Sequence, residues 1–150
     1  MLAARARTEQ ELRAALQRRG FSSSHVDEVV REMTRLGYLD DPKTAQRWAE
    51  YDAESGQWGV LGIARRLASR GLDPDLAAAS ARAACEGRDE FGVALAIARR
   101  KIAAEGPTSA GDDRALERVK RHVAGMLERR GFTTETIARV IREAFSGHGE

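Results

Sequence analysis

The chain has 150 residues, of which 42% are hydrophobic and 32% charged, a balance that excludes a disordered chain. Its net charge is only +2, so it does not fit the class of proteins that bind nucleic acid through overall charge alone. Aromatic residues make up 5%, strong helix formers dominate and strand-type runs are almost absent, which predicts an all-α protein.

The N-terminal stretch MLAARARTEQ is basic but contains no apolar core and no cleavage site, so it does not read as a secretory signal. No apolar run approaches the ~20 residues that cross a bilayer. The sole cysteine, Cys85, excludes an internal disulfide and lies in an alanine-rich stretch where a small buried side chain is favoured over a reactive thiol. We expect a cytoplasmic protein without membrane contact.

The first predicted helix ends in LRAALQRRGF, residues 12–21, where apolar residues four apart form one stripe. Arginines in its last turn favour the negative end of the helix dipole. Gly20 can then adopt the left-handed conformation that ends a helix, and Phe21 is expected to fold back onto it. A second helix follows after serine caps, with an apolar face formed by Val26, Val29, Val30 and Met33.

The stretch LGYLDD, residues 36–41, separates this second helix from a third, PKTAQRWAEYDAES. Gly37 is predicted to end the second helix, with Tyr38 and Leu39 turning inward. Either Asp40 or Asp41 is predicted to cap the third helix, whose first residue would be Pro42. The alternative, a metal or acid–base pair, requires converging histidines or further carboxylates. None stands at a suitable spacing, so we favour capping.

The same pattern of an apolar stripe, a basic last turn and a glycine recurs twice. It is found in IARRLASRGL, whose glycine is Gly71, and in VAGMLERRGF, whose last two residues are Gly131 and Phe132. After Gly71 come a helix capped by Asp73 and a third helix, EFGVALAIARRKIAAE. After the linker EGPTSAGDD and the last copy of this pattern, a helix TTETIARVIREAF follows. Its apolar stripe consists of Ile137, Val140, Ile141 and Phe145.

The recurrence predicts three tandem three-helix repeats, over residues 1–56, 57–106 and 107–150, with the last repeat truncated. Such units bury their apolar faces partly against their neighbours and form an elongated, curved array. This architecture suits a long partner surface better than a deep substrate pocket. We expect a monomer.

Basic residues close to the ends of several predicted helices are the candidate partner contacts. Adjacent residues on a helix diverge by about 100°, so a basic doublet cannot be wholly buried. The plain interpretation is a solvated face, and the functional one is a basic strip that meets an acidic surface or phosphates. The first choices are Arg65, Arg66 and Lys101. The full set is Arg65, Arg66, Arg70, Arg99, Arg100, Lys101, Arg129 and Arg130.

Several motifs in order resemble the RecX family, bacterial regulators of the RecA recombinase. The motif residues are Leu2, Arg5, Thr8, Glu11 and Leu12, then the glycine-ended helix, GYLDD, Ala45, Trp48, Gly59 ahead of IARRLASRGL, and the final RRGF. The resemblance covers nearly the whole chain. It also marks Gly37, Tyr38, Leu39, Asp40, Asp41, Trp48, Gly71, Gly131 and Phe132 as structural motif positions.

The resemblance implies a three-repeat protein that lies in the groove of the RecA filament on single-stranded DNA. There it would inhibit or modulate ATP hydrolysis, strand exchange and filament growth, without a cofactor of its own. The chain departs from the family pattern at two places. Thr44 stands where a bulky aromatic is common, which predicts a looser first core, and the segment after Trp48, often basic, reads AEYDAESGQ and is acidic.

Two other functions compete with this interpretation. The stretch RRGFTTETIARVIREAF resembles the turn and second helix of a helix-turn-helix, which would make the chain a weak direct DNA binder. Its outward residues Thr134, Glu135, Arg139 and Arg142 are mixed in charge. The other alternative is a helical scaffold for some further partner. An enzyme is least favoured, because the sequence has no phosphate-binding loop and no arrangement of nucleophile and base.

Overall fold

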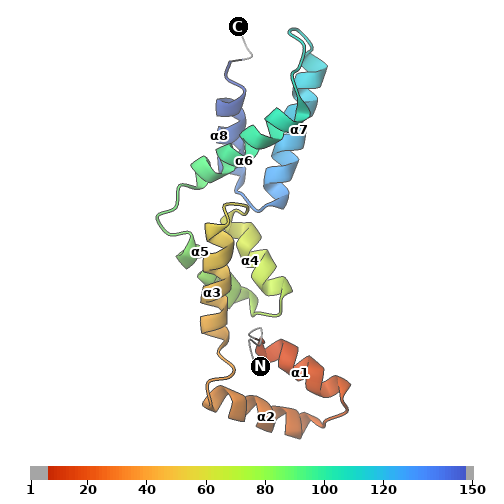
Figure 1. The fold of residues 1–150 in the computed structure, drawn as a ribbon, viewed down its shortest axis with the longest axis vertical. Coiled ribbons are helices and arrows are strands. Elements are labelled where there is room, and N and C mark those ends of the chain that lie inside the picture. Colours follow the sequence, from red (N-terminus) through yellow and green to blue (C-terminus); the bar gives the residue numbers. More distant parts are fainter. Residues whose placement is uncertain (1–6, 148–150) are drawn as a thin grey trace.

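The computed structural model describes residues 7–147, and over that range it consists of eight α-helices and no strand (Figure 1). The helices are α1 (Glu9–Arg18), α2 (Ser23–Arg35), α3 (Asp41–Glu54), α4 (Val60–Ser69), α5 (Pro74–Ala84), α6 (Glu90–Glu105), α7 (Asp113–Arg129) and α8 (Thr134–Ala144). The all-α prediction and the elongated array are confirmed. Leu2 and Arg5 of the sequence motif lie outside the described residues.

In all three copies of the repeated pattern, the helix ends at a glycine and the residue after the glycine donates the same hydrogen bond. Gly20, Gly71 and Gly131 have φ of +86°, +101° and +85°. The N–H of the next residue then bonds to a carbonyl five residues back, at 3.3, 3.3 and 3.1 Å. This is the Schellman arrangement, in which a left-handed residue lets the chain satisfy carbonyls at the end of a helix.

The helices group differently from the order in which the sequence repeats them. One core cluster joins α1 and α2, a second joins α3, α4 and α5, and a third joins α6, α7 and α8. The third helix of a predicted repeat therefore packs with the pair of helices that follows it. Each boundary between predicted repeats therefore divides a core cluster, so the array is continuous.

Two expected inward-facing residues lie on the surface instead. Phe21 is 51% exposed, whereas its counterparts Leu72 and Phe132 are 2% and 3% exposed. The first core cluster is small, consisting of Val26, Val30 and Leu39 with a few partly buried neighbours, and it offers Phe21 no cover. Tyr38 is 75% exposed, so the prediction that Tyr38 turns inward is wrong, while Leu39 is buried as expected.

Asp40 and Asp41 have different tasks, which settles the choice left open by the sequence. Helix α3 begins at Asp41, one residue before the predicted start, and the Asp40 carboxylate accepts the Lys43 N–H at 3.1 Å as the N-cap. Asp41 instead accepts the Glu9 N–H at 3.1 Å and so links the start of α3 to the start of α1. Partial burial raises the pKa of the Asp41 carboxyl group.

We expect Asp40→Ala to lower the free energy of unfolding by about 0.5–2 kcal/mol, because it removes an N-cap acceptor. Asp113→Ala is the matched control, since Asp113 occupies the first turn of α7 while Asp112 supplies the cap. Urea unfolding of both variants measures the difference. Equal midpoints for wild type and Asp40→Ala would show that the cap does not stabilise α3.

Candidate partner-binding groove

The N-terminus of α4 is held by the backbone of the turn between α7 and α8. Among the described helices, α4 alone starts without a side-chain cap, because Gly59 occupies its N-cap position. Its N–H groups find partners in the distant turn: Gly59 donates to the Arg130 carbonyl at 2.8 Å and Leu61 to the Gly131 carbonyl at 3.1 Å. The free donors of one helix thus meet the free acceptors of another.

Glycine makes this contact possible on both sides. A Cβ on Gly62 would lie 2.1 Å from the Arg130 carbonyl oxygen, and one on Gly131 would lie 1.8 Å from the Gly62 nitrogen. Both distances are far inside van der Waals contact. The backbones therefore touch directly, and the second and third core clusters are joined at a fixed point.

Around this contact, Trp58 is flanked by two guanidinium groups. The Arg66 guanidinium carbon lies 4.2 Å from the Trp58 ring centroid and that of Arg130 lies 5.7 Å from it. Arg66 also donates to the carboxylate of Asp52 at 2.9 and 3.3 Å, and Asp52 is only 3% exposed. Arg130 donates to the carbonyl and side-chain oxygens of Gln57 at 3.1 and 2.7 Å. We call these five residues the Trp58 cluster.

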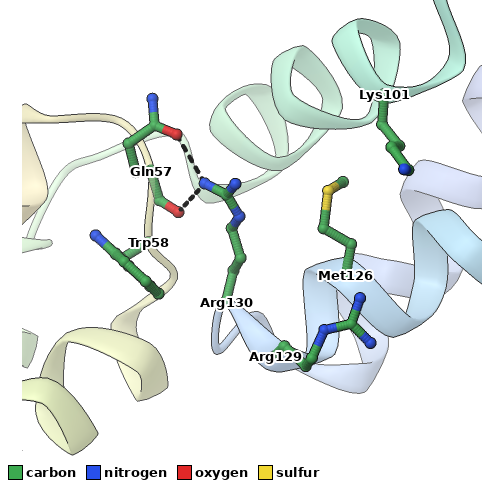
Figure 2. Close-up of a pocket in the computed structure, with 6 residues that line it drawn as sticks. All are labelled: Gln57, Trp58, Lys101, Met126, Arg129 and Arg130. Atoms are coloured by element: carbon green, nitrogen blue, oxygen red, sulfur yellow. Dashed lines mark hydrogen bonds between the residues drawn. The ribbon is translucent and has the colours of Figure 1, made fainter. Parts of the chain in front are cut away.

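A groove of about 660 Å³ opens beside the Trp58 cluster (Figure 2). It is lined by Gln57, Trp58, Lys101, Met126, Arg129 and Arg130. Figure 2 shows the Lys101 side chain reaching it from α6, while Met126 and Arg129 reach it from α7. The groove combines cationic groups with an apolar thioether and part of an indole ring, so it suits an acidic ligand with some apolar surface.

Glu105 moderates the positive charge beside the groove. Its carboxylate lies 3.1 Å from Nδ1 of His122 and 3.2 Å from the ammonium of Lys101. These hydrogen bonds, that of His122 first and then that of Lys101, lower the pKa of Glu105. The contact also fastens the end of α6 to the middle of α7, so it positions Lys101 as well as partly neutralising it.

The structure places the predicted contact residues in two groups. The first group makes contacts within the protein. Arg66 and Arg130 belong to the Trp58 cluster. Arg70 stacks 3.3 Å from the centroid of Trp48, and Arg65 donates to the Glu128 carbonyl at 3.2 Å. Arg99, Arg100 and Arg129 are exposed, and Lys101 and Arg129 meet at the groove.

This division changes the first choice of contacts. Charge reversal at Arg66 would set a glutamate against the buried Asp52, so Arg66 is a poor probe of a partner surface. Arg99, Arg100 and Arg129 are better probes of a partner surface because their side chains do not pair with a buried carboxylate.

Single arginines on α7 form a basic face that the arginine doublets do not indicate. Arg114, Arg118 and Arg121 are exposed and follow one another at separations of four and three residues, which places them on one face with Arg129. That spacing is visible in the sequence. Helical spacing therefore reveals these residues, whereas adjacency of basic residues does not.

The helix-turn-helix alternative loses one of its contact residues to packing. Helix α8 lies against α6 and α7, and the guanidinium of Arg139 stacks 3.8 Å from the ring centroid of Phe91 on α6. Arg142 is exposed. The outward face of α8 therefore offers a DNA groove fewer free cations than the sequence suggested.

Chemically reactive groups are few in the part of the chain that the structure describes. No group of three or more His, Cys, Asp or Glu residues is placed there to hold a metal ion. Cys85 is buried at the end of α5, and its desolvation raises the pKa of the thiol, which disfavours the reactive thiolate. No helix in residues 7–147 is long and apolar enough to span a membrane.

Comparison with known proteins links this geometry to a family. Residues 1–33 match the model described as RecX, first three-helix domain. The regulatory protein RecX of Mycolicibacterium vanbaalenii is 32% identical over 138 residues, which cover 92% of this chain and 74% of that protein. The regulatory protein RecX of Trichlorobacter lovleyi is 30% identical over 132 residues, with coverage of 88% and 82%.

A solved structure shares the fold. The crystal structure of RecX from Lactobacillus salivarius superposes with a TM-score of 0.76 and covers 95% of this chain and 88% of that chain. Its sequence identity to this chain is 17%, so the likeness concerns the arrangement of the helices.

Proposed function

The chain belongs to the RecX family of regulatory proteins, and from that premise we propose that it regulates a RecA recombinase. In this proposal the protein binds the RecA filament on single-stranded DNA as a cytoplasmic monomer. Bound protein inhibits or modulates the ATP hydrolysis, strand exchange and growth of the filament. The observation that carries the proposal is a similarity to regulatory RecX proteins that extends over 92% of the chain.

The shape and the charge of the array support binding to an extended assembly. The helices form a long body (Figure 1), and a repetitive filament offers a surface of matching length. The exposed cations Arg99 and Arg100 lie on α6, and the exposed Arg129 of α7 lines the groove together with Lys101. Their charges would speed encounter with an acidic filament surface and orient the bound protein.

The test follows ATP hydrolysis by the cognate RecA on single-stranded DNA as the protein is added. We expect wild type to reduce the rate, and we expect Arg99→Glu/Arg100→Glu/Arg129→Glu to need at least about tenfold more protein for the same reduction, a loss of roughly 1.4 kcal/mol. The matched control is Arg31→Glu/Arg82→Glu/Arg142→Glu, which changes the net charge equally at exposed sites on other helices.

Two outcomes would count against the proposal. If folded wild-type protein left the ATPase rate and the filament lifetime unchanged, the chain would be a helical scaffold for another partner. If both triple variants lost inhibition equally, overall charge would matter and the α6–α7 surface would not be the contact. Circular dichroism of each variant shows whether the helices are retained.

A further inference from the structure

Four arginines form a row along the outer face of α7. Arg114, Arg118, Arg121 and Arg129 are separated by four, three and eight residues, which places them within a sector of about 80° at 100° per residue. All four are exposed. Ala115, Val119, Val123 and Leu127 are buried on the opposite side. Because packing of that side fixes the rotation of the helix, the row must face outward. We call these four residues the α7 arginine row.

Gly125 occupies the gap in the row. It lies four residues after Arg121 and four before Arg129, and a Cβ added there would lie 3.2 Å from Nη1 of Arg129. The Arg129 guanidinium therefore folds back along the helix over the glycine. This brings its charge closer to Arg121 and leaves no side chain to interrupt the row.

The row lacks partners within the protein. Among residues 7–147, no hydrogen bond, ion pair or ring contact engages the guanidinium of Arg114, Arg118, Arg121 or Arg129. Several other arginines are bound: Arg13, Arg35, Arg66 and Arg88 each meet a carboxylate. A charged side chain without a partner within the protein can bind a charged group of another molecule.

Acidic residues border the row but do not neutralise it. Glu117 lies at its edge and is engaged by Lys120 at 3.2 Å, while Asp113 and Glu128 are exposed on the same helix. None of the three is paired with an arginine of the row. The neighbouring His122 is held by Glu105, so it adds no free donor to the row.

The composition of the row indicates which polyanion fits it. It extends for about 22 Å, from 15 residues at 1.5 Å each, and it contains no apolar or aromatic side chain. Protein interfaces place apolar and aromatic residues at their centre, and base-stacking surfaces require aromatic rings. A line of unpaired guanidinium groups suits a line of phosphates, which it can bind without reading base sequence.

We propose that the α7 arginine row binds the phosphate backbone of nucleic acid. The proposal concerns the protein alone and is independent of any recombinase. It differs from the helix-turn-helix alternative, since α7 lies along the backbone and α8 does not enter a groove. A duplex presents phosphates at fixed spacing and a single strand presents them flexibly, so the two sources of the same chemistry are compared directly.

The experiment measures fluorescence anisotropy of a short labelled duplex, and of one of its strands, with protein at several salt concentrations. We expect binding to weaken with salt at a slope near −3.6 on logarithmic axes for about four phosphate contacts to duplex. Arg114→Ala/Arg118→Ala/Arg121→Ala should weaken binding at least about tenfold at low salt and reduce the slope by about three. Arg31→Ala/Arg82→Ala/Arg142→Ala is the control and should change both values little.

Each result decides for or against the proposal. Loss of binding by the α7 variant alone, with either form of DNA, supports phosphate recognition and identifies the preferred form. Equal binding by wild type and the α7 variant overturns it, as does equal loss in the control or the absence of binding at low salt. Polyglutamate that displaces DNA mole for mole would assign the row to an acidic protein surface instead. Circular dichroism and thermal unfolding confirm that both variants are folded.

Discussion

Gly131→Ala should lower the free energy of unfolding by roughly 4 kcal/mol or more, whereas Gly20→Ala should lower it by only about 1–2 kcal/mol. The two glycines end equivalent helices with nearly identical φ, +85° and +86°. The strain of placing an L-residue in the left-handed region is therefore the same at both positions. Any difference between them reports the surroundings.

Those surroundings differ completely. A Cβ on Gly20 would meet no atom within 4 Å, while one on Gly131 would lie 1.8 Å from the Gly62 nitrogen. To relieve that overlap, the α7–α8 turn must withdraw from α4, and the hydrogen bonds donated by Gly59 and Leu61 are then lost. The N–H of the buried Gly59 is then left without an acceptor, which adds to the cost of the displaced backbone.

Urea unfolding followed by circular dichroism measures both variants. We expect Gly131→Ala also to broaden the transition or split it in two, because separation of the second and third core clusters ends their shared unfolding. Gly37→Ala, at φ +81° with no atom within 4 Å, is a second control. Equal losses for Gly131→Ala and Gly20→Ala would show that the backbones do not touch in solution.

Arg66→Ala is the second change with a large expected effect, a loss of about 3 kcal/mol in the free energy of unfolding. It removes the hydrogen-bonding partner of Asp52, whose carboxylate side chain is 5% exposed, while the side chain of Arg66 itself is 41% exposed. The cost arises mainly from the charge left behind, since a buried carboxylate without a partner has lost its hydration and gained nothing in exchange. Loss of the guanidinium over Trp58 adds a smaller term.

A double-mutant cycle separates these contributions. Asp52→Ala/Arg66→Ala leaves no unpaired buried charge, so its cost should be smaller than the sum of the two single changes. Arg99→Ala is the control for removing an exposed arginine and should alter stability by no more than about 0.5 kcal/mol. Additive losses at Asp52 and Arg66 would mean that the ion pair does not couple α3 to α4.

Local structure was largely predictable from the sequence because it depends on residues close together in the chain. Glycines after apolar stripes end the helices at Gly20, Gly71 and Gly131. The predicted apolar faces of α2 and α8 contain the buried residues of those helices, Val26 and Val30 in α2 and Val140 in α8. Each of these features requires only that a few neighbouring side chains share one face or one terminal turn. The regulatory RecX family was identified from the same motifs, since order and spacing are themselves properties of the chain.

Tertiary structure decided which surfaces remain free. No spacing in the sequence shows that Arg66 is held by Asp52 or that Arg130 reaches back to Gln57. Equivalent positions also diverged: Phe132 is buried by its neighbours in the third core cluster, whereas the small first cluster leaves Phe21 exposed. The contact of Gly131 with Gly62 joins residues distant in the chain. Such features depend on which helices pack together. That packing, and not the position of a side chain within its own repeat, determines whether the side chain is buried, paired or exposed.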